Sequence, residues 1–73
     1  MSAEFRFEIT QKIAVLSRNE NTDWAKEVNF VSWNGKNPRL DIREWSPDHK
    51  HCSRGVILSY EETVALKQAL SEI

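Results

Sequence analysis

The chain has 73 residues, of which 40% are hydrophobic, and it carries a net charge of −1 and a single cysteine, Cys52. A chain of this length forms one domain, residues 1–73, with a small core, and a lone cysteine excludes an intrachain disulfide and suits a reducing compartment. No segment approaches the roughly 18 apolar residues of a membrane helix, and the N-terminal residues lack a signal-peptide core. We therefore expect a cytoplasmic protein with no membrane partner.

The charges are spread unevenly along the chain. The net charge is −1 over residues 1–23, +2 over residues 24–55 and −2 over residues 56–73. The basic middle segment also holds all three tryptophans, Trp24, Trp33 and Trp45. The low total charge argues against an indiscriminate binder of polyanions. Cations that coincide with aromatic rings are typical of a surface for single-stranded nucleic acid.

The first part of the chain predicts two strands. Phe5, Phe7 and Ile9 alternate with polar residues, and the extended pattern continues to residue 16 across a bend or bulge. A polar turn follows over residues 19–23, and residues 24–33 predict a second strand. The alternation of this second strand is imperfect, so either both of its faces are partly covered or a bulge shifts its register.

The third strand, residues 39–45, carries the most informative pattern. It follows a turn headed by Asn-Gly, a strong hairpin signal, and it ends before Pro47, which cannot donate to a ladder. Leu40 and Ile42 fall on one face and are expected to pack inward. The opposite row is expected to meet solvent and consists of Arg39, Asp41, Arg43 and Trp45. A large indole beside a guanidinium on a solvated strand face is unusual and suits a surface that stacks on bases.

The end of the chain predicts a short strand and a helix. After a loop over residues 49–53, residues 54–58 form an apolar fourth strand. Ser59 and Glu62 have the spacing of a capping box, which predicts a helix start. Leu66, Leu70 and Ile73 then form an apolar stripe at helical spacing.

The predicted fold is α+β: a four-stranded antiparallel β-meander followed by a C-terminal α-helix, in the order β-β-β-β-α. One helix can cover only one face of such a sheet, so the other face is wet, is covered by a second subunit or is the working surface. A second copy would also enlarge a small core. We therefore expect a homodimer with Leu66 and Leu70 in or beside its interface.

The motifs resemble a known family. The segment 41–45 (Asp-Ile-Arg-Glu-Trp), followed by the segment 55–59 and an amphipathic helix, resembles the eukaryotic transcriptional coactivator positive cofactor four (PC4). The segments 24–34 and 45–49 look more like the small bacterial YdbC-type members of that superfamily. The resemblance spans residues 7–70. It implies a homodimer of β-β-β-β-α subunits that binds single-stranded DNA across its sheets.

The resemblance also implies roles for individual residues. Arg43 matches the strand arginine of the family, Trp45 the aromatic residue after it, and Arg54 the basic residue before the glycine. The preceding strand and turn supply further basic and aromatic positions. With Arg39 from the solvent-facing row, the candidate nucleic-acid-binding residues are Lys26, Trp33, Lys36, Arg39, Arg43, Trp45 and Arg54.

Some of these side chains also have structural interpretations. Trp45 could be an edge-strand residue packed under the following loop, and Trp24 or Trp33 could serve the core or a dimer interface. Arg43 could pair with Asp41 or Glu27 instead of with a phosphate. The sequence leaves these alternatives open.

From these features we expect sequence-tolerant binding of single-stranded DNA, with RNA left open as a target. Lys and Arg would contact phosphates and Trp rings would stack on bases. Such a protein would be an accessory factor in transcription or DNA maintenance. The alternative is a protein–protein interaction module that acts as a transcriptional co-regulator and touches nucleic acid only incidentally.

Catalysis and metal binding find little support. Asp48, His49, His51 and Cys52 are competent metal ligands, but they crowd into one loop, whereas a structural zinc site spreads its ligands over two elements. No nucleophile with a suitable base and no paired carboxylates beside an apolar pocket stand out. We expect no enzymatic activity, cofactor, metal or small-molecule substrate, and we expect this loop to be a solvated connection.

Overall fold

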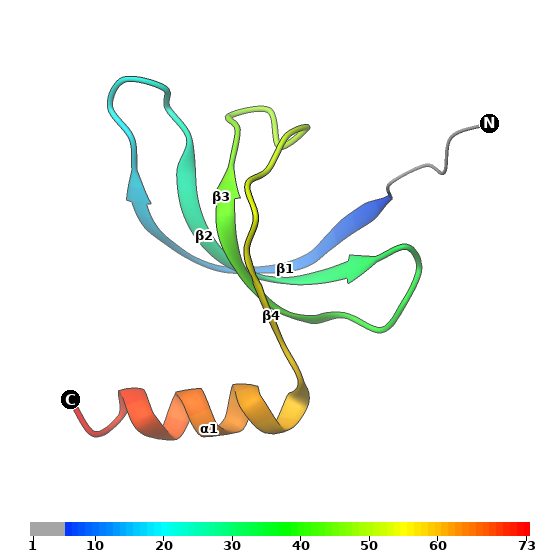
Figure 1. The fold of residues 1–73 in the computed structure, drawn as a ribbon, viewed down its shortest axis with the longest axis vertical. Helices are drawn as coiled ribbons and strands as arrows, with labels where there is room; N and C mark the ends of the chain where they lie inside the picture. Colours follow the sequence, from blue (N-terminus) through cyan, green and yellow to red (C-terminus); the bar gives the residue numbers. More distant parts are fainter. Residues whose placement is uncertain (1–5) are drawn as a thin grey trace.

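The computed structural model describes residues 6–73, so Phe5 of the predicted first strand lies outside the described residues. The elements are β1 (Phe7–Arg18), β2 (Ala25–Trp33), β3 (Arg39–Trp45), β4 (Val56–Leu58) and α1 (Tyr60–Leu70). The strands form one antiparallel sheet in the order β1-β2-β3-β4, followed by the single helix (Figure 1). The predicted order of elements is confirmed.

Strand β1 is long and strongly curved (Figure 1). Its pairing with β2 shifts register three times, between Ile9 and Gln11, between Lys12 and Ala14, and between Val15 and Ser17. Each extra residue bends the strand and increases its twist. Strand β2 pairs with β3 without any shift. The predicted bulge therefore belongs to β1, and the alternation of β2 is imperfect because both of its faces are partly covered.

The local signals at the ends of the elements are confirmed. Asn34 and Gly35 both adopt positive φ angles, 54° and 77°, as a tight hairpin turn of the primed type requires. The side chain of Ser59 accepts a hydrogen bond from the Glu62 amide at 3.1 Å, and the Glu62 carboxylate accepts one from the Ser59 amide at 2.8 Å. This reciprocal capping box satisfies two amides that the first turn of α1 leaves without helical partners.

The two faces of the sheet are covered by different parts of the chain. We call one the helix face, because α1 begins over it; its apolar side chains are Val28, Phe30, Leu40, Ile42 and Leu58. We call the other the loop face, because the β3–β4 loop, residues 46–55, crosses it; it carries Glu27, Asn29, Trp33, Asp41, Arg43 and Trp45. The helix face is mainly apolar and also carries Lys26 and Glu44, whereas the loop face combines polar and aromatic residues with the buried Ala25 and Val31.

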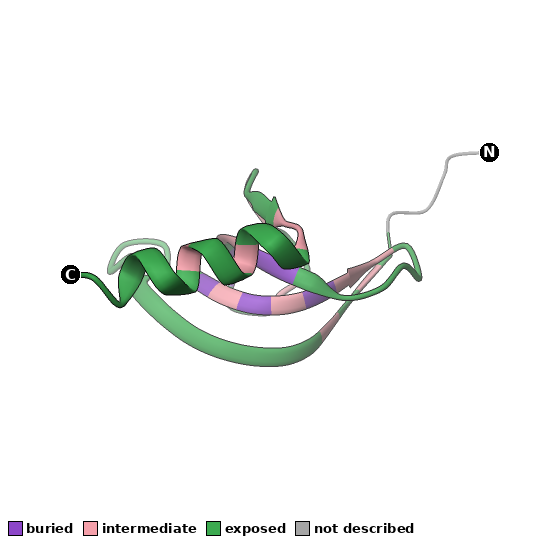
Figure 2. Cartoon of the chain, turned by 90° about the horizontal axis from the view of Figure 1, so that it is seen from below, coloured by how far each residue is buried: buried purple, intermediate pink, exposed green. Residues whose placement is uncertain are grey.

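Helix α1 buries none of its residues fully and contacts only β3 and β4. Thr63 and Leu66 are half-buried on the side that meets the sheet, while Leu70 and Ile73 of the predicted stripe are exposed. Figure 2 shows most of the helix coloured as exposed. Among the described residues, no helix has both the length and the apolar character needed to cross a membrane.

Candidate nucleic-acid interface

The centre of the loop face is buried. The expectation that the row of β3 meets solvent is wrong for three of its four residues: Asp41 and Trp45 are 0% and 1% exposed, and the side chain of Arg43 is 10% exposed. Only Arg39 is exposed. The reason is that the β3–β4 loop folds back along β3, with a hydrogen bond from the Ser53 amide to the Glu44 carbonyl oxygen at 2.9 Å.

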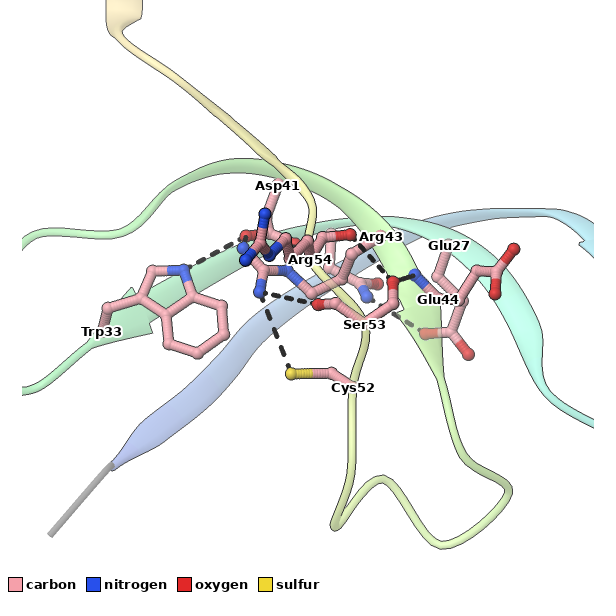
Figure 3. A network of polar contacts seen from close by, with 9 residues as sticks. Glu27, Trp33, Asp41, Arg43, Glu44, Cys52, Ser53 and Arg54 are labelled. Carbon is pink, nitrogen blue, oxygen red and sulfur yellow. Dashed lines mark hydrogen bonds and ion pairs between the residues drawn. The ribbon is translucent and has the colours of Figure 1, made fainter.

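Arg43 ties this loop to the sheet (Figure 3). Its Nε and Nη2 donate to the two carboxylate oxygens of Asp41 at 2.7 and 2.8 Å, and its Nη1 donates to the carbonyl oxygen of Ser53 at 3.2 Å. Nη1 also lies 3.8 Å from the Sγ of Cys52. The pairing of Arg43 with Asp41 is thus observed, on one strand and two residues apart. Burial acts to lower the pKa of Arg43, but the Asp41 hydrogen bond and charge outweigh it and raise that pKa.

The same pair fixes the indole of Trp33. The Nε1 of Trp33 donates to Asp41 Oδ2 at 3.2 Å, and the guanidinium carbon of Arg43 lies 4.4 Å from the centre of the Trp33 ring. A guanidinium over an indole adds cation–π attraction to the hydrogen bond. Trp33 is therefore held in one orientation at the end of β2.

Gly55 permits the close return of the loop. A Cβ atom at this position would lie 2.5 Å from the carbonyl oxygen of Ile42 and closer still to the Cβ of Arg43. Real Cβ atoms do not approach backbone that closely, so any other residue would push the loop away from β3. A glycine at position 55 is therefore required for steric reasons.

Aromatic rings form a row on the loop face. The ring centres of Trp33 and Trp45 lie 6.2 Å apart at an interplanar angle of 10°, and those of Trp45 and His49 lie 5.6 Å apart at 30°. Phe7 packs on Trp45 at 4.9 Å. Trp45 is the buried middle of this row, under the loop, as its structural interpretation describes, while Trp33 and His49 are its half-buried ends.

Three of the seven candidate residues line one hollow. It has a volume of about 190 Å³ and is formed by Trp33, Lys36, Asn37, Arg39 and Ile57. The turn that carries Lys36 is fixed, because the Lys36 amide donates to the Trp33 carbonyl oxygen at 3.0 Å and the Ser32 hydroxyl donates to the Lys36 carbonyl oxygen at 2.6 Å. The hollow therefore brings together an oriented indole and two exposed cationic side chains.

The remaining candidates lie elsewhere. Arg43 lies next to Trp33 in the buried network, and Arg54 is exposed at the end of the loop, between Ser53 and Gly55, which both lie against Arg43. Lys26 is on the helix face, opposite Glu44, so the structure does not bring it to the hollow. The set predicted from sequence is thus divided between the two faces.

Comparison with known proteins identifies the family. Residues 20–69 match the family model described as Transcriptional Coactivator p15 (PC4). The chain belongs to the PC4 family. It is also 39% identical over 70 residues to an uncharacterized protein of Treponema pallidum (strain Nichols), a match that covers 96% of this chain and 81% of that protein. The resemblance seen in the sequence is confirmed, and PC4 membership indicates a nucleic-acid-binding or coactivator-like role.

The PC4 fold of this chain also contains a polar cluster that the sequence did not reveal. The Nε2 of His49 lies 3.0 and 3.2 Å from the two carboxylate oxygens of Glu27, and the Nδ2 of Asn29 donates to Glu27 Oε1 at 3.0 Å. Glu27 and Asn29 are buried. His49 lies 22 residues from Glu27, so no local pattern could have indicated this contact.

The loop itself is only partly the solvated connection that was expected. His51 is exposed, but His49 and Cys52 are half-buried and contact Glu27 and Arg43. Within residues 6–73, no group of three or more His, Cys, Asp or Glu side chains is arranged to hold a metal ion. In this PC4-family chain, the loop covers Trp45 and places His49 against Glu27.

Proposed function

We propose that this PC4-family protein binds single-stranded nucleic acid, with DNA as the primary target, at the hollow formed by Trp33, Lys36 and Arg39. The observation that supports this most directly is that the indole and two exposed cations line the same hollow. Stacking of a base on an aromatic side chain contributes about 1–3 kcal/mol, and every base has a π-face. A duplex hides its base faces within the stack, so it should bind more weakly than a single strand.

Arg43 has a positioning role in this proposal. Together with Asp41 it holds the Trp33 indole, and it also ties the loop to β3. Direct contacts of Arg43 with a phosphate and of Trp45 with a base stay predictions, because the loop covers both side chains. Arg54, which is exposed nearby, is better placed to reach a phosphate.

The functional unit in this proposal is a homodimer. Val56, Val64 and Leu70 are large apolar side chains of β4 and α1 that are about half exposed. A second copy of the chain would remove this surface from water and would join two loop faces into one binding surface. The dimer would act in the cytoplasm as a binding protein rather than an enzyme, as an accessory factor in transcription or DNA maintenance.

The test is fluorescence anisotropy with labelled oligo-dT at several salt concentrations. Lys36→Ala and Arg39→Ala should each flatten the slope of log K against log salt by about 0.7, because each removes one phosphate contact. Trp33→Leu should weaken binding by about 1–3 kcal/mol and leave that slope intact. Lys67→Ala, on the exposed side of α1, is the control for loss of one charge.

Two outcomes would contradict the proposal. One is a parent protein that binds duplex as tightly as single strands in competition, and the other is a set of folded hollow variants that bind oligo-dT like the parent. The exposed apolar surface of α1 would then favour the second candidate, a protein–protein interaction module that grips a partner with this helix.

A further inference from the structure

We propose that His49 stacks on a base at a second nucleotide site, in a groove at the other end of the loop face, where Lys12 and Arg18 contact the phosphates. This inference rests on the proposed function, because it extends the path of the same strand. The sequence had suggested no nucleic-acid-binding role for His49, Lys12 or Arg18.

The groove lies between β1, β2 and the β3–β4 loop. It has a volume of about 330 Å³, and its lining residues are Lys12, Ile13, Ala14, Val15, Arg18, Glu27, Asn29 and His49. Cross-strand pairing places Lys12 opposite Asn29 and Val15 opposite Glu27. These β1 side chains therefore project on the same side of the sheet as the aromatic row.

The imidazole of His49 is held in place from two directions. Its Nε2 contacts both oxygens of Glu27, a carboxylate that is itself buried and bonded to Asn29. One side of the ring packs on Trp45. The side chain nevertheless stays 31% exposed and lines the groove. A ring that is fixed in this way loses little conformational entropy when a base stacks on it.

The backbone at His49 has an uncommon conformation at the end of a turn, in which the His49 amide donates to the Ser46 carbonyl oxygen at 2.9 Å. His49 adopts a φ of 59°, a left-handed conformation that residues other than glycine rarely take. Such a conformation persists when surrounding contacts enforce it, and it is frequent where a side chain must be aimed at a ligand. Here the enforcing contacts are the Glu27 carboxylate and the Trp45 ring.

The rim of the groove is cationic. Lys12 and Arg18 are both exposed, whereas the side chain of Glu27 is only 6% exposed and is already bonded. Arg18 lies 3.9 Å from the Asp23 carboxylate and donates a hydrogen bond to the Asp23 carbonyl oxygen at 3.3 Å, and both are exposed contacts that a phosphate can replace. With His49 neutral, the charged residues that line the groove are two cations, Lys12 and Arg18, and one buried carboxylate, Glu27, so their net charge is positive. Val15 adds an exposed apolar wall for a sugar or a base edge.

The groove and the hollow lie on one path. Glu27 and Trp33 are on the same face of β2, and the curved sheet brings the two ends of this face together, since the ring centres of Trp33 and Trp45 lie 6.2 Å apart and those of Trp45 and His49 lie 5.6 Å apart. The buried Trp45 joins the two ends of the aromatic row, His49 at the groove and Trp33 at the hollow. The ring centres of Trp33 and His49 are no more than about 12 Å apart, so a mononucleotide can occupy only one of these sites, whereas a strand of a few nucleotides can reach both.

The experiment compares variants on thymidine nucleotides of increasing length, from the mononucleotide to about 16 nucleotides. For long strands, His49→Ala should weaken binding roughly 5- to 150-fold, and His49→Phe, which keeps a ring, should retain most of the affinity. Lys12→Ala should flatten the salt slope by about 0.7 for long strands only. The controls are His51→Ala, from the exposed part of the same loop, and Lys67→Ala.

A second measurement needs no substitution. The ring protons of the two histidines can be followed by NMR as oligo-dT is added, and only those of His49 should move upfield. Folded His49→Ala and Lys12→Ala variants that bind long strands like the parent, with both histidines unshifted, would overturn the groove while leaving the hollow intact. A parent protein that binds no single strand at all would overturn the proposed function itself, and the groove with it.

Discussion

The centre of the loop face and the surface of α1 differ in which side chains they bury. On the loop face, a single chain buries polar residues and bonds them to one another, including Glu27, Asn29 and Asp41. On α1 no residue is fully buried, and the apolar side chains of Val64 and Leu70 remain about half exposed. The difference is that β2, β3 and the loop bury their polar side chains within one chain, whereas β4 and α1 leave large apolar side chains exposed.

The largest effect should come from breaking the loop face at Asp41. Asp41→Ala removes the carboxylate that pairs with Arg43 and accepts from Trp33, and it leaves the guanidinium of Arg43 buried without its partner. Removing one partner of a buried ion pair costs about 3–5 kcal/mol in the free energy of unfolding. Urea denaturation at fixed protein concentration measures this loss. Glu20→Ala, in the exposed turn before β2, is the control and should change stability by less than about 0.5 kcal/mol.

A smaller effect should come from changing the surface of α1. Leu70→Lys should leave the chain folded, because Leu70 is 56% exposed, but should weaken a dimer interface that buries it. Burial of a leucine side chain contributes about 1.5–3 kcal/mol, so the dimer dissociation constant should rise at least about tenfold. Sedimentation equilibrium measures this shift. Gln68→Lys introduces the same charge on the same helix and should disturb the dimer less.

The predicted homodimer can itself be tested by sedimentation. A parent protein that sediments as a folded 8.5 kDa monomer at micromolar concentration would show that α1 tolerates its exposed apolar surface without a partner. The exposure of apolar side chains on α1, in contrast to the burial on the loop face, would then not be explained by a dimer interface.

Local features of the fold were predictable because neighbouring residues determine them. The Asn34–Gly35 turn needs two left-handed residues, and the capping box of Ser59 and Glu62 is a reciprocal contact across three residues. The alternation of β3 also placed Leu40 on the inner side of the helix face, where it is 9% exposed. These signals act over a few residues, so the sequence shows them directly.

The binding face was harder to predict because its exposure depends on a distant segment. Alternation placed Arg43 and Trp45 on one side of β3, which is where they lie. It could not show that the loop returns over them, since that return depends on the fit of Gly55 against Arg43 and on the contact of His49 with Glu27. The indole at the hollow is consequently Trp33, at the end of β2, where the loop does not cover it.

The smallest effect should be an acid sensitivity of the loop itself. The Asp48 carboxylate accepts hydrogen bonds from the Lys50 amide at 3.0 Å and from the Ser46 hydroxyl at 2.7 Å. These bonds, the amide first, lower the pKa of Asp48 below its usual value. A carboxyl whose pKa is lower in the folded state stabilises that state above the pKa of the unfolded chain, about 3.9, and this contribution disappears as the pH falls through the folded-state pKa. The stability difference between the parent and Asp48→Ala should therefore be present at neutral pH and shrink below about pH 3.9.

Asp48→Asn, which keeps an oxygen acceptor but cannot ionise, should lose the pH dependence that this group contributes. NMR titration of the Asp48 carboxyl carbon checks the sign independently, and a midpoint above that of an unperturbed aspartate would contradict the prediction.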